Sequence, residues 1–132
     1  MIEPFVAEGR GFRIRFDLHP GYLRAYVHDG VDSLDVSIAV WRMLAEQCRT
    51  HRMERLLVLE DLTGTVADED VPRVIDAMVD AGFDDIRVSF VELQGHHQGN
   101  ERGEILGMEH GLAVHLASSE NAARHWLLYG GE

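Results

Sequence analysis

Four consecutive apolar residues, Leu56 to Leu59, stand between two stretches with helical periodicity. The earlier stretch carries an apolar stripe made of Leu34, Ile38, Trp41, Ala45 and Cys48. The later one carries a stripe made of Val71, Val74, Ile75, Met78 and Val79. A strand without a polar face has to be covered on both sides, which is the situation of a central parallel strand. The run therefore predicts an α/β domain built around a mostly parallel sheet.

The first third of the chain predicts an antiparallel hairpin at one edge of this sheet. Apolar residues at 12, 14, 16 and 18 alternate with polar ones, His19-Pro20-Gly21 forms a turn, and residues 22–28 return as a strand. Further along, we expect strands at 86–93 and 112–117, a helix at 97–110, and a last helix capped by Ser118 or Ser119. The expected order is β-β-α-β-α-β-α-β-α, with about four helices. Residues 1–11 are predicted to form a tail, and residues 12–132 a single domain.

Charge and cysteine content narrow the partners and the compartment. The 23 acidic and 12 basic residues give a net charge of -11, and the arginines form no run. A surface this negative repels phosphate backbones and anionic lipids, so we expect no nucleic-acid partner and no membrane insertion. The single cysteine, Cys48, rules out an internal disulfide and is expected to be an inert core thiol rather than a reactive one. With no apolar leader segment, the chain is expected in the cytoplasm.

Two stretches carry a family resemblance. Residues 56–64 read Leu-Leu-Val-Leu-Glu-Asp-Leu-Thr-Gly and lead through a short loop into a helix. Nearer the C-terminus, a helix ending at Gly111 is followed by the strand at 112–116 and by an Ala-x-x-x-Trp-Leu helix, residues 122–127. In these features the chain resembles the STAS fold of anti-sigma-factor antagonists, and more closely the SpoIIAA-like bacterial proteins. The resemblance implies a non-catalytic regulatory or protein-interaction module that needs no cofactor, has an unidentified protein partner and has the option of forming a homodimer.

In that family, a serine at the start of the helix after the central strand is phosphorylated to switch partner binding. Here the corresponding turn, residues 65–70, contains no serine, and the nearest hydroxyls belong to Thr63 and Thr65. Three carboxylates occupy the place where a phosphate would sit, which suggests either a permanently phosphorylated-like surface or ordinary helix-start chemistry. The predicted switch or partner surface comprises Glu60, Asp61, Thr63, Thr65, Asp68, Glu69 and Asp70.

Two other functions remain open. Some SpoIIAA-like proteins are grouped with lipid-carrying Sec14-like domains, which implies a pocket over the strand ends for a lipid-like or other hydrophobic ligand. An enzyme or metal protein would instead use the paired carboxylates Glu60 and Asp61 at the end of the central strand, or His96, His97 and Glu101. Exposed polar residues are common in an acidic protein, so solvated side chains are the simpler interpretation of both groups.

Glycines recur at every fourth position from Gly95 to Gly111. On a helix they would form one bare stripe, which allows close approach of a backbone, a partner or a ligand. Because each glycine costs a helix about 1 kcal/mol relative to alanine, the favoured expectation is a flexible loop followed by a short helix at 104–110, with Gly111 as its C-cap.

Overall fold

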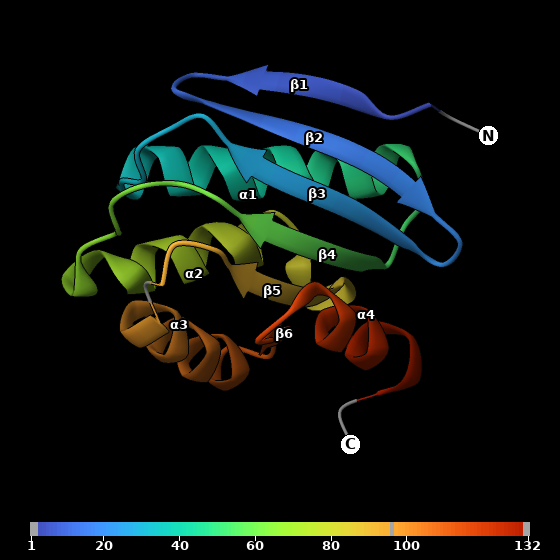
Figure 1. The fold of residues 1–132 in the computed structure, drawn as a ribbon. Helices are drawn as coiled ribbons and strands as arrows, with labels where there is room; N and C mark the ends of the chain where they lie inside the picture. The colour runs from blue at the N-terminus through green and yellow to red at the C-terminus, as the bar shows by residue number, and fades with distance from the viewer. Residues whose placement is uncertain (1–2, 96, 131–132) are drawn as a thin grey trace.

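The computed structural model describes the backbone of residues 3–95 and 97–130, together with their side chains except those of residues 97–99. Its strands are β1 (Phe5–Gly9), β2 (Phe12–His19), β3 (Tyr22–His28), β4 (Arg55–Glu60), β5 (Arg87–Glu92) and β6 (Ala113–Leu116). They form one six-stranded sheet in chain order, in which β1, β2 and β3 are antiparallel and β3 to β6 are parallel (Figure 1). The expected α/β class with a mostly parallel sheet and an antiparallel N-terminal part is confirmed.

Four helices cover the sheet unequally. They are α1 (Leu34–Thr50), α2 (Val71–Asp80), α3 (His97–Glu109) and α4 (Glu120–Tyr129). Helices α1, α2 and α3 pack against the larger apolar cluster on one face, while α4 packs alone against the other face over β4 and β5 (Figure 1). Ser33 and Ser119 accept hydrogen bonds from the amides of Val36 and Ala122, and so cap α1 and α4.

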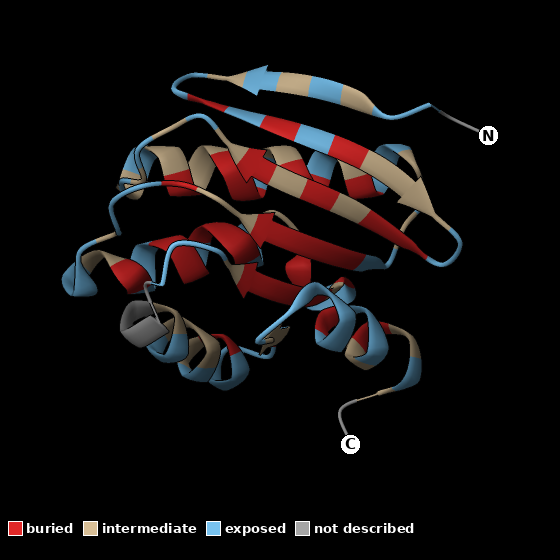
Figure 2. Ribbon diagram, in the orientation of Figure 1, coloured by how far each residue is buried: buried red, intermediate tan, exposed pale blue. Residues whose placement is uncertain are grey.

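Strand β4 is the centre of the fold. Leu56 and Val58 belong to the cluster beneath α1 and α2, whereas Leu57 and Leu59 contact the side chains of α4. All four are buried, and β4 and β5 are the most continuously buried strands in Figure 2. The apolar run thus faces protein on both sides, as a central parallel strand requires. One detail of the helical stripes differs, since Val79 is exposed at the end of α2.

The N-terminal strand β1 was not expected from the sequence. It lies within the segment predicted to be a tail, and it pairs with β2, so the hairpin of β2 and β3 is not at the sheet edge. Phe5 stacks on Phe16 with ring centroids 5.2 Å apart, and Ala7 joins the same cluster. The only sequence signal for this strand was the short alternation of Phe5 and Ala7 before the turn at Gly11, whose φ is +88°.

The glycine-rich segment is a helix and not the expected loop. Helix α3 runs from His97 to Glu109, and Gly103 and Gly107 face its neighbours rather than solvent. Cβ atoms added at these positions would lie 3.9 Å from Val71 of α2 and 3.7 Å from Leu112. Such Cβ atoms would make only ordinary contacts, and the packing of α3 against α2 and β6 outweighs the low helix propensity of glycine. Gly111 follows the helix with a φ of +81°, as a C-cap residue does.

Two glycine-to-alanine changes should shift stability in opposite directions. A Cβ at Gly30 would lie 2.2 Å from the carbonyl oxygen of Gly11, so Gly30→Ala should lower the free energy of unfolding by about 1–3 kcal/mol. Gly103→Ala meets only ordinary contacts in a helix interior and should raise it by about 0.5–1 kcal/mol. Urea denaturation of both variants measures the two effects. A destabilised Gly103→Ala protein would mean that α3 packs more tightly than described.

Candidate functional site

A cavity of about 120 Å³ lies where the parallel strands end, between the sheet and helices α1, α2 and α3. This is the place where open α/β sheets usually bind ligands. The apolar part of its lining consists of Trp41, Leu62, Val66, Val71, Val74, Ile75, Met78, Phe90, Val114 and Leu116. The remaining residues are polar or small: Asp32, Ser37, Glu60, Gly64, Thr65, Glu92, Asn100, Gly103 and Glu104.

Trp41 forms a rigid part of the cavity wall. Its ring packs edge-on against Phe83, with centroids 5.4 Å apart, and tilts against Phe90 at 6.0 Å. Sequence analysis assigned Trp41 to the core, and it is indeed buried. Its second role at a cavity wall depends on the position of α3, which the periodicity of α1 does not reveal.

Carboxylates gather at the polar end of the cavity. Glu60 and Glu92 are register partners at the carboxyl ends of β4 and β5, Asp32 precedes α1, and Glu104 projects from α3. Glu104 is held in place because it accepts a hydrogen bond from the Leu116 amide at 2.7 Å. We call Asp32, Glu60, Glu92 and Glu104 the acidic neck.

Glu60 is the unusual member of the acidic neck. Its side chain is partly buried at the end of β4, and its carboxyl makes no hydrogen bond or ion pair with the described residues. Burial, followed by the negative charges of Asp32 and Glu92, raises the pKa of Glu60 to about 8. The carboxyl is therefore largely protonated at neutral pH and presents a hydrogen-bond donor to the cavity.

Asp61 lies on the other side of the sheet, so the two neighbouring carboxylates do not form a pair. Its oxygens accept hydrogen bonds from the Tyr26 hydroxyl at 2.5 Å and from the Gln94 amide. These hydrogen bonds lower the pKa of Asp61 below its usual value. Successive strand residues point to opposite faces, and this alternation separates Glu60 from Asp61.

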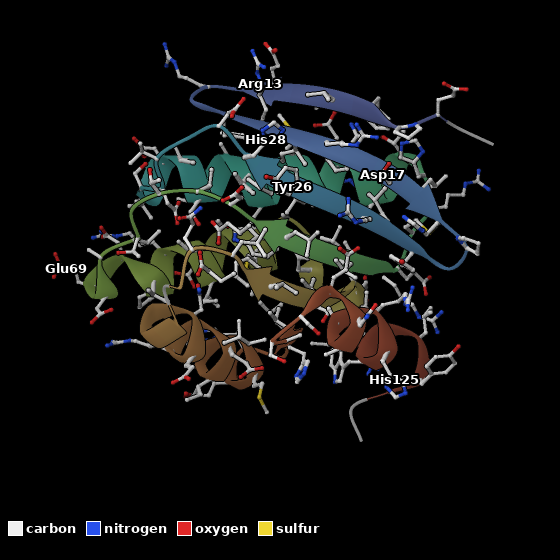
Figure 3. All side chains as sticks on the ribbon, in the orientation of Figure 1. Arg13, Asp17, Tyr26, His28, Glu69 and His125 are labelled. Carbon is white, nitrogen blue, oxygen red and sulfur yellow. The ribbon has the colours of Figure 1, made fainter. Side chains whose placement is uncertain are left out.

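The remaining residues of the predicted partner surface lie in the segment between β4 and α2, which borders the cavity at Gly64, Thr65 and Val66. Thr65 lines the cavity, and the Thr63 carbonyl accepts a hydrogen bond from the Asp32 amide at 2.7 Å. Asp68, Glu69 and Asp70 form a 3₁₀ turn just before α2 rather than the first turn of that helix. Figure 3 shows Glu69 projecting from this turn at the periphery of the molecule.

The histidine-based metal hypothesis gains no geometric support. His96 and the side chain of His97 lie outside the described residues, and Glu101 is exposed on α3. Within the described part of the chain, no group of three or more histidine, cysteine, aspartate or glutamate residues is arranged to hold a metal ion. Cys48 is buried, and burial raises its thiol pKa to about 12, which agrees with an inert core residue.

The opposite face of the sheet is open over β1, β2 and β3 and carries polar side chains. Figure 3 shows Arg13, Asp17, Tyr26 and His28 on this face. Arg24 there is already neutralised, because it binds Glu120 at 2.7 Å and Asp17 at 3.1 Å. The face is therefore a mixed-charge surface rather than a basic patch.

Comparison with known proteins identifies no relative. No protein-family model matches the chain, and neither a curated protein nor a solved structure matches it. In the part of the chain that the structure describes, no helix combines the length and apolarity needed to cross a bilayer. The function is therefore argued from the geometry of the cavity and its surroundings.

Replacing Glu60 by an uncharged residue should remove a loss of folding stability that grows with pH. A carboxyl whose folded pKa is raised binds its proton more tightly in the folded state, so its ionisation disfavours folding as the pH rises from about 4.5 toward 8. Relative to the unaltered protein, Glu60→Gln should gain stability between about pH 4.5 and 8, by up to about 1.4 kcal/mol per pH unit, and the gain should level off above pH 8.

Denaturation at several pH values measures this difference. Glu101→Gln, which removes an exposed charge from α3, is the control and should show no such trend. Parallel stability curves for Glu60→Gln and the control would mean that Glu60 is solvated.

Proposed function

We propose that this chain is a non-catalytic binding module that holds a small, mostly apolar ligand in the cavity at the ends of β4, β5 and β6. The observation that carries the proposal is the cavity itself, which combines an aromatic and aliphatic wall with a few convergent polar groups. Such a combination is typical of small-molecule sites. An enclosed apolar cavity of about 150 Å³ holds benzene; this one is smaller, about 120 Å³, but is open on one side, so it suits a compact ligand such as a single ring or a short branched chain.

The polar groups of the cavity favour binding over catalysis. Ser37 and Thr65 are the hydroxyl residues of its described lining, which includes no histidine, lysine or cysteine. A hydroxyl without an adjacent base is a weak nucleophile, and the described lining offers neither Ser37 nor Thr65 a histidine or lysine base. A long lipid chain could not be wholly enclosed in this volume, so the ligand proposed here is smaller than the lipid-like one expected from the sequence.

The module is proposed to belong to the STAS or SpoIIAA-like type and to act in the cytoplasm. The antiparallel start, the parallel strands in chain order and the single helix on the second face agree with the element order that suggested the resemblance. In this view a ligand would stabilise the rim at Thr65 and Val66, which leads into the acidic turn before α2. Ligand binding would thereby influence a protein-contact surface.

Filling the cavity should abolish ligand binding without unfolding the protein. Val74 of α2 lines the cavity, whereas Val79 of the same helix is exposed and does not. Benzene and toluene should raise the melting temperature of the unaltered protein and of Val79→Phe, and leave that of Val74→Phe unchanged. Thermal unfolding with and without each compound is the measurement. Equal stabilisation of both variants would place binding elsewhere and contradict the proposal.

A second function, protein binding at the acidic turn, is favoured by one observation. Asp70 is neutralised by Arg73, with which it makes a 2.5 Å ion pair. Asp68 and Glu69 are exposed and make no ion pair with the described residues, so their charges are available to a basic partner. Neither Thr63 nor Thr65 is needed for this contact, and phosphorylation of either remains a separate hypothesis.

Charge reversal at the acidic turn tests this second function. The double variant Asp68→Lys, Glu69→Lys should retain the melting temperature of the parent protein. Its affinity for the partner should fall at least about tenfold, because charge complementarity controls such contacts. The parent protein and the double variant are each used to capture partners from cells. Titration of the recovered partner against each then measures the loss of affinity. The matched control reverses Asp84 and Asp85, which are exposed between α2 and β5. An equal loss in both double variants would reflect net charge alone.

A further inference from the structure

We propose that two copies of this chain form a dimer by packing their α3 helices against each other head to tail. The contact uses the exposed side of α3, which carries Arg102, Ile105, Met108 and Glu109 and is called here the α3 surface. The inference goes beyond the proposed function, because the cavity lies on the other side of this helix, at Gly103 and Glu104. Two observations carry it, an exposed apolar pair and two charges that complement a second copy.

The α3 surface carries two apolar side chains that the core does not take up. Ile105 and Met108 are 59% and 67% exposed, whereas Leu106 and Gly107 of the same helix pack inward. Residues three apart are neighbours on a helix, so Ile105 and Met108 form one apolar patch. Helix α3 packs against α2 and β6 through its other side. Burial of the patch against another protein would therefore be favourable and would leave the fold unchanged.

The charges beside this patch select a second copy of the chain. Arg102 and Glu109 are exposed and make no ion pair with the described residues. They are seven positions apart, so they lie two turns apart along the same side of Ile105 and are too distant to neutralise each other. When two such helices pack antiparallel about a two-fold axis near Ile105, Arg102 of each copy comes opposite Glu109 of the other. One symmetric contact thus forms two opposite-charge pairs and covers the apolar patch.

Other arrangements of two copies are less favourable. A parallel pair of α3 helices would place Arg102 against Arg102 and Glu109 against Glu109, and like charges repel. The net charge of -11 disfavours self-association through the acidic surfaces of the protein, whereas Arg102 and Glu109 cancel within the α3 contact. One side of a 13-residue helix offers less contact than the about 800 Å² per partner of a standard interface. We therefore expect a weak dimer whose population depends on protein concentration.

Exchange of the two charges tests this arrangement. In sedimentation equilibrium at increasing protein concentration, the average mass of the unaltered protein should rise from that of one chain toward that of two. Arg102→Glu alone and Glu109→Arg alone each create like-charge pairs and should weaken dimerisation at least about tenfold. The double variant Arg102→Glu, Glu109→Arg restores both opposite-charge pairs with their signs exchanged, so it should dimerise about as tightly as the unaltered protein. A contact through another surface predicts no such recovery.

Matched variants separate the α3 contact from net charge and from folding. Arg42→Glu makes the same change of charge on the exposed side of α1 and should leave dimerisation unchanged. Ile105→Ser should weaken dimerisation by about tenfold with little change in melting temperature, because this side chain is exposed in the single chain. Benzene and toluene should stabilise the dimer-deficient variants as much as the unaltered protein, since the cavity lies on the other side of α3.

Each outcome decides for or against the α3 dimer. Dimerisation that is lost in both single variants and recovered in the double variant supports it. A chain that stays monomeric at its highest soluble concentration overturns it, even if a different protein binds at Ile105. A dimer that Arg102→Glu leaves intact, or that the double variant fails to recover, uses another surface and overturns it as well.

Discussion

Burial of strand β4 on both faces is the constraint from which the rest of the architecture follows. Leu56 and Val58 need the cover of α1 and α2, and Leu57 and Leu59 need the cover of α4. A strand in this position can be reached only by crossover connections, so parallel pairing and interleaved helices accompany it. The same geometry brings the ends of β4, β5 and β6 to one edge, where side chains from three helices converge. A cavity forms at that edge because the sheet and the helices that cover it end there without closing completely over one another.

The approach of α3 determines whether that edge is closed or open. Gly103 and Gly107 let the helix lie close to Val71 and Leu112, and Glu104 on the same helix binds the Leu116 amide. Alanine fits at either glycine, whereas longer side chains would move α3 outward and alter the cavity. Few apolar residues of α3 are buried, and Ile105 and Met108 are exposed. Close backbone contact and a side-chain hydrogen bond therefore replace part of the apolar anchoring that α1 and α2 possess.

Sequence reasoning succeeded where a pattern reports a local requirement and failed where the answer depends on a distant partner. The run at Leu56–Leu59, the cap at Ser119 and the turn at Gly21 each carry their own physical signal, and the fold class follows from them. Strand β1 was missed because five residues gain their structure only by pairing with β2. Helix α3 was underestimated because propensity counts the cost of glycine and cannot count the contacts it permits. Glu60 was identified as a candidate, but its separation from Asp61 and its place among Asp32, Glu92 and Glu104 required the assembled sheet.

The state of Glu60 links stability to the proposed function. A leucine or methionine at this position would satisfy the apolar cavity without the cost of burying an acid beside two others. Such a cost is tolerated most readily where it is offset when a ligand binds, so departures from simple packing rules concentrate at functional sites. The neighbouring Asp61 shows the contrast: it has the same position at the strand end, is fully hydrogen-bonded to Tyr26 and Gln94, and has a lowered pKa. One strand end thus carries a carboxylate hydrogen-bonded to protein side chains on one face and, on the other, a partly buried carboxyl with a raised pKa that lines a cavity.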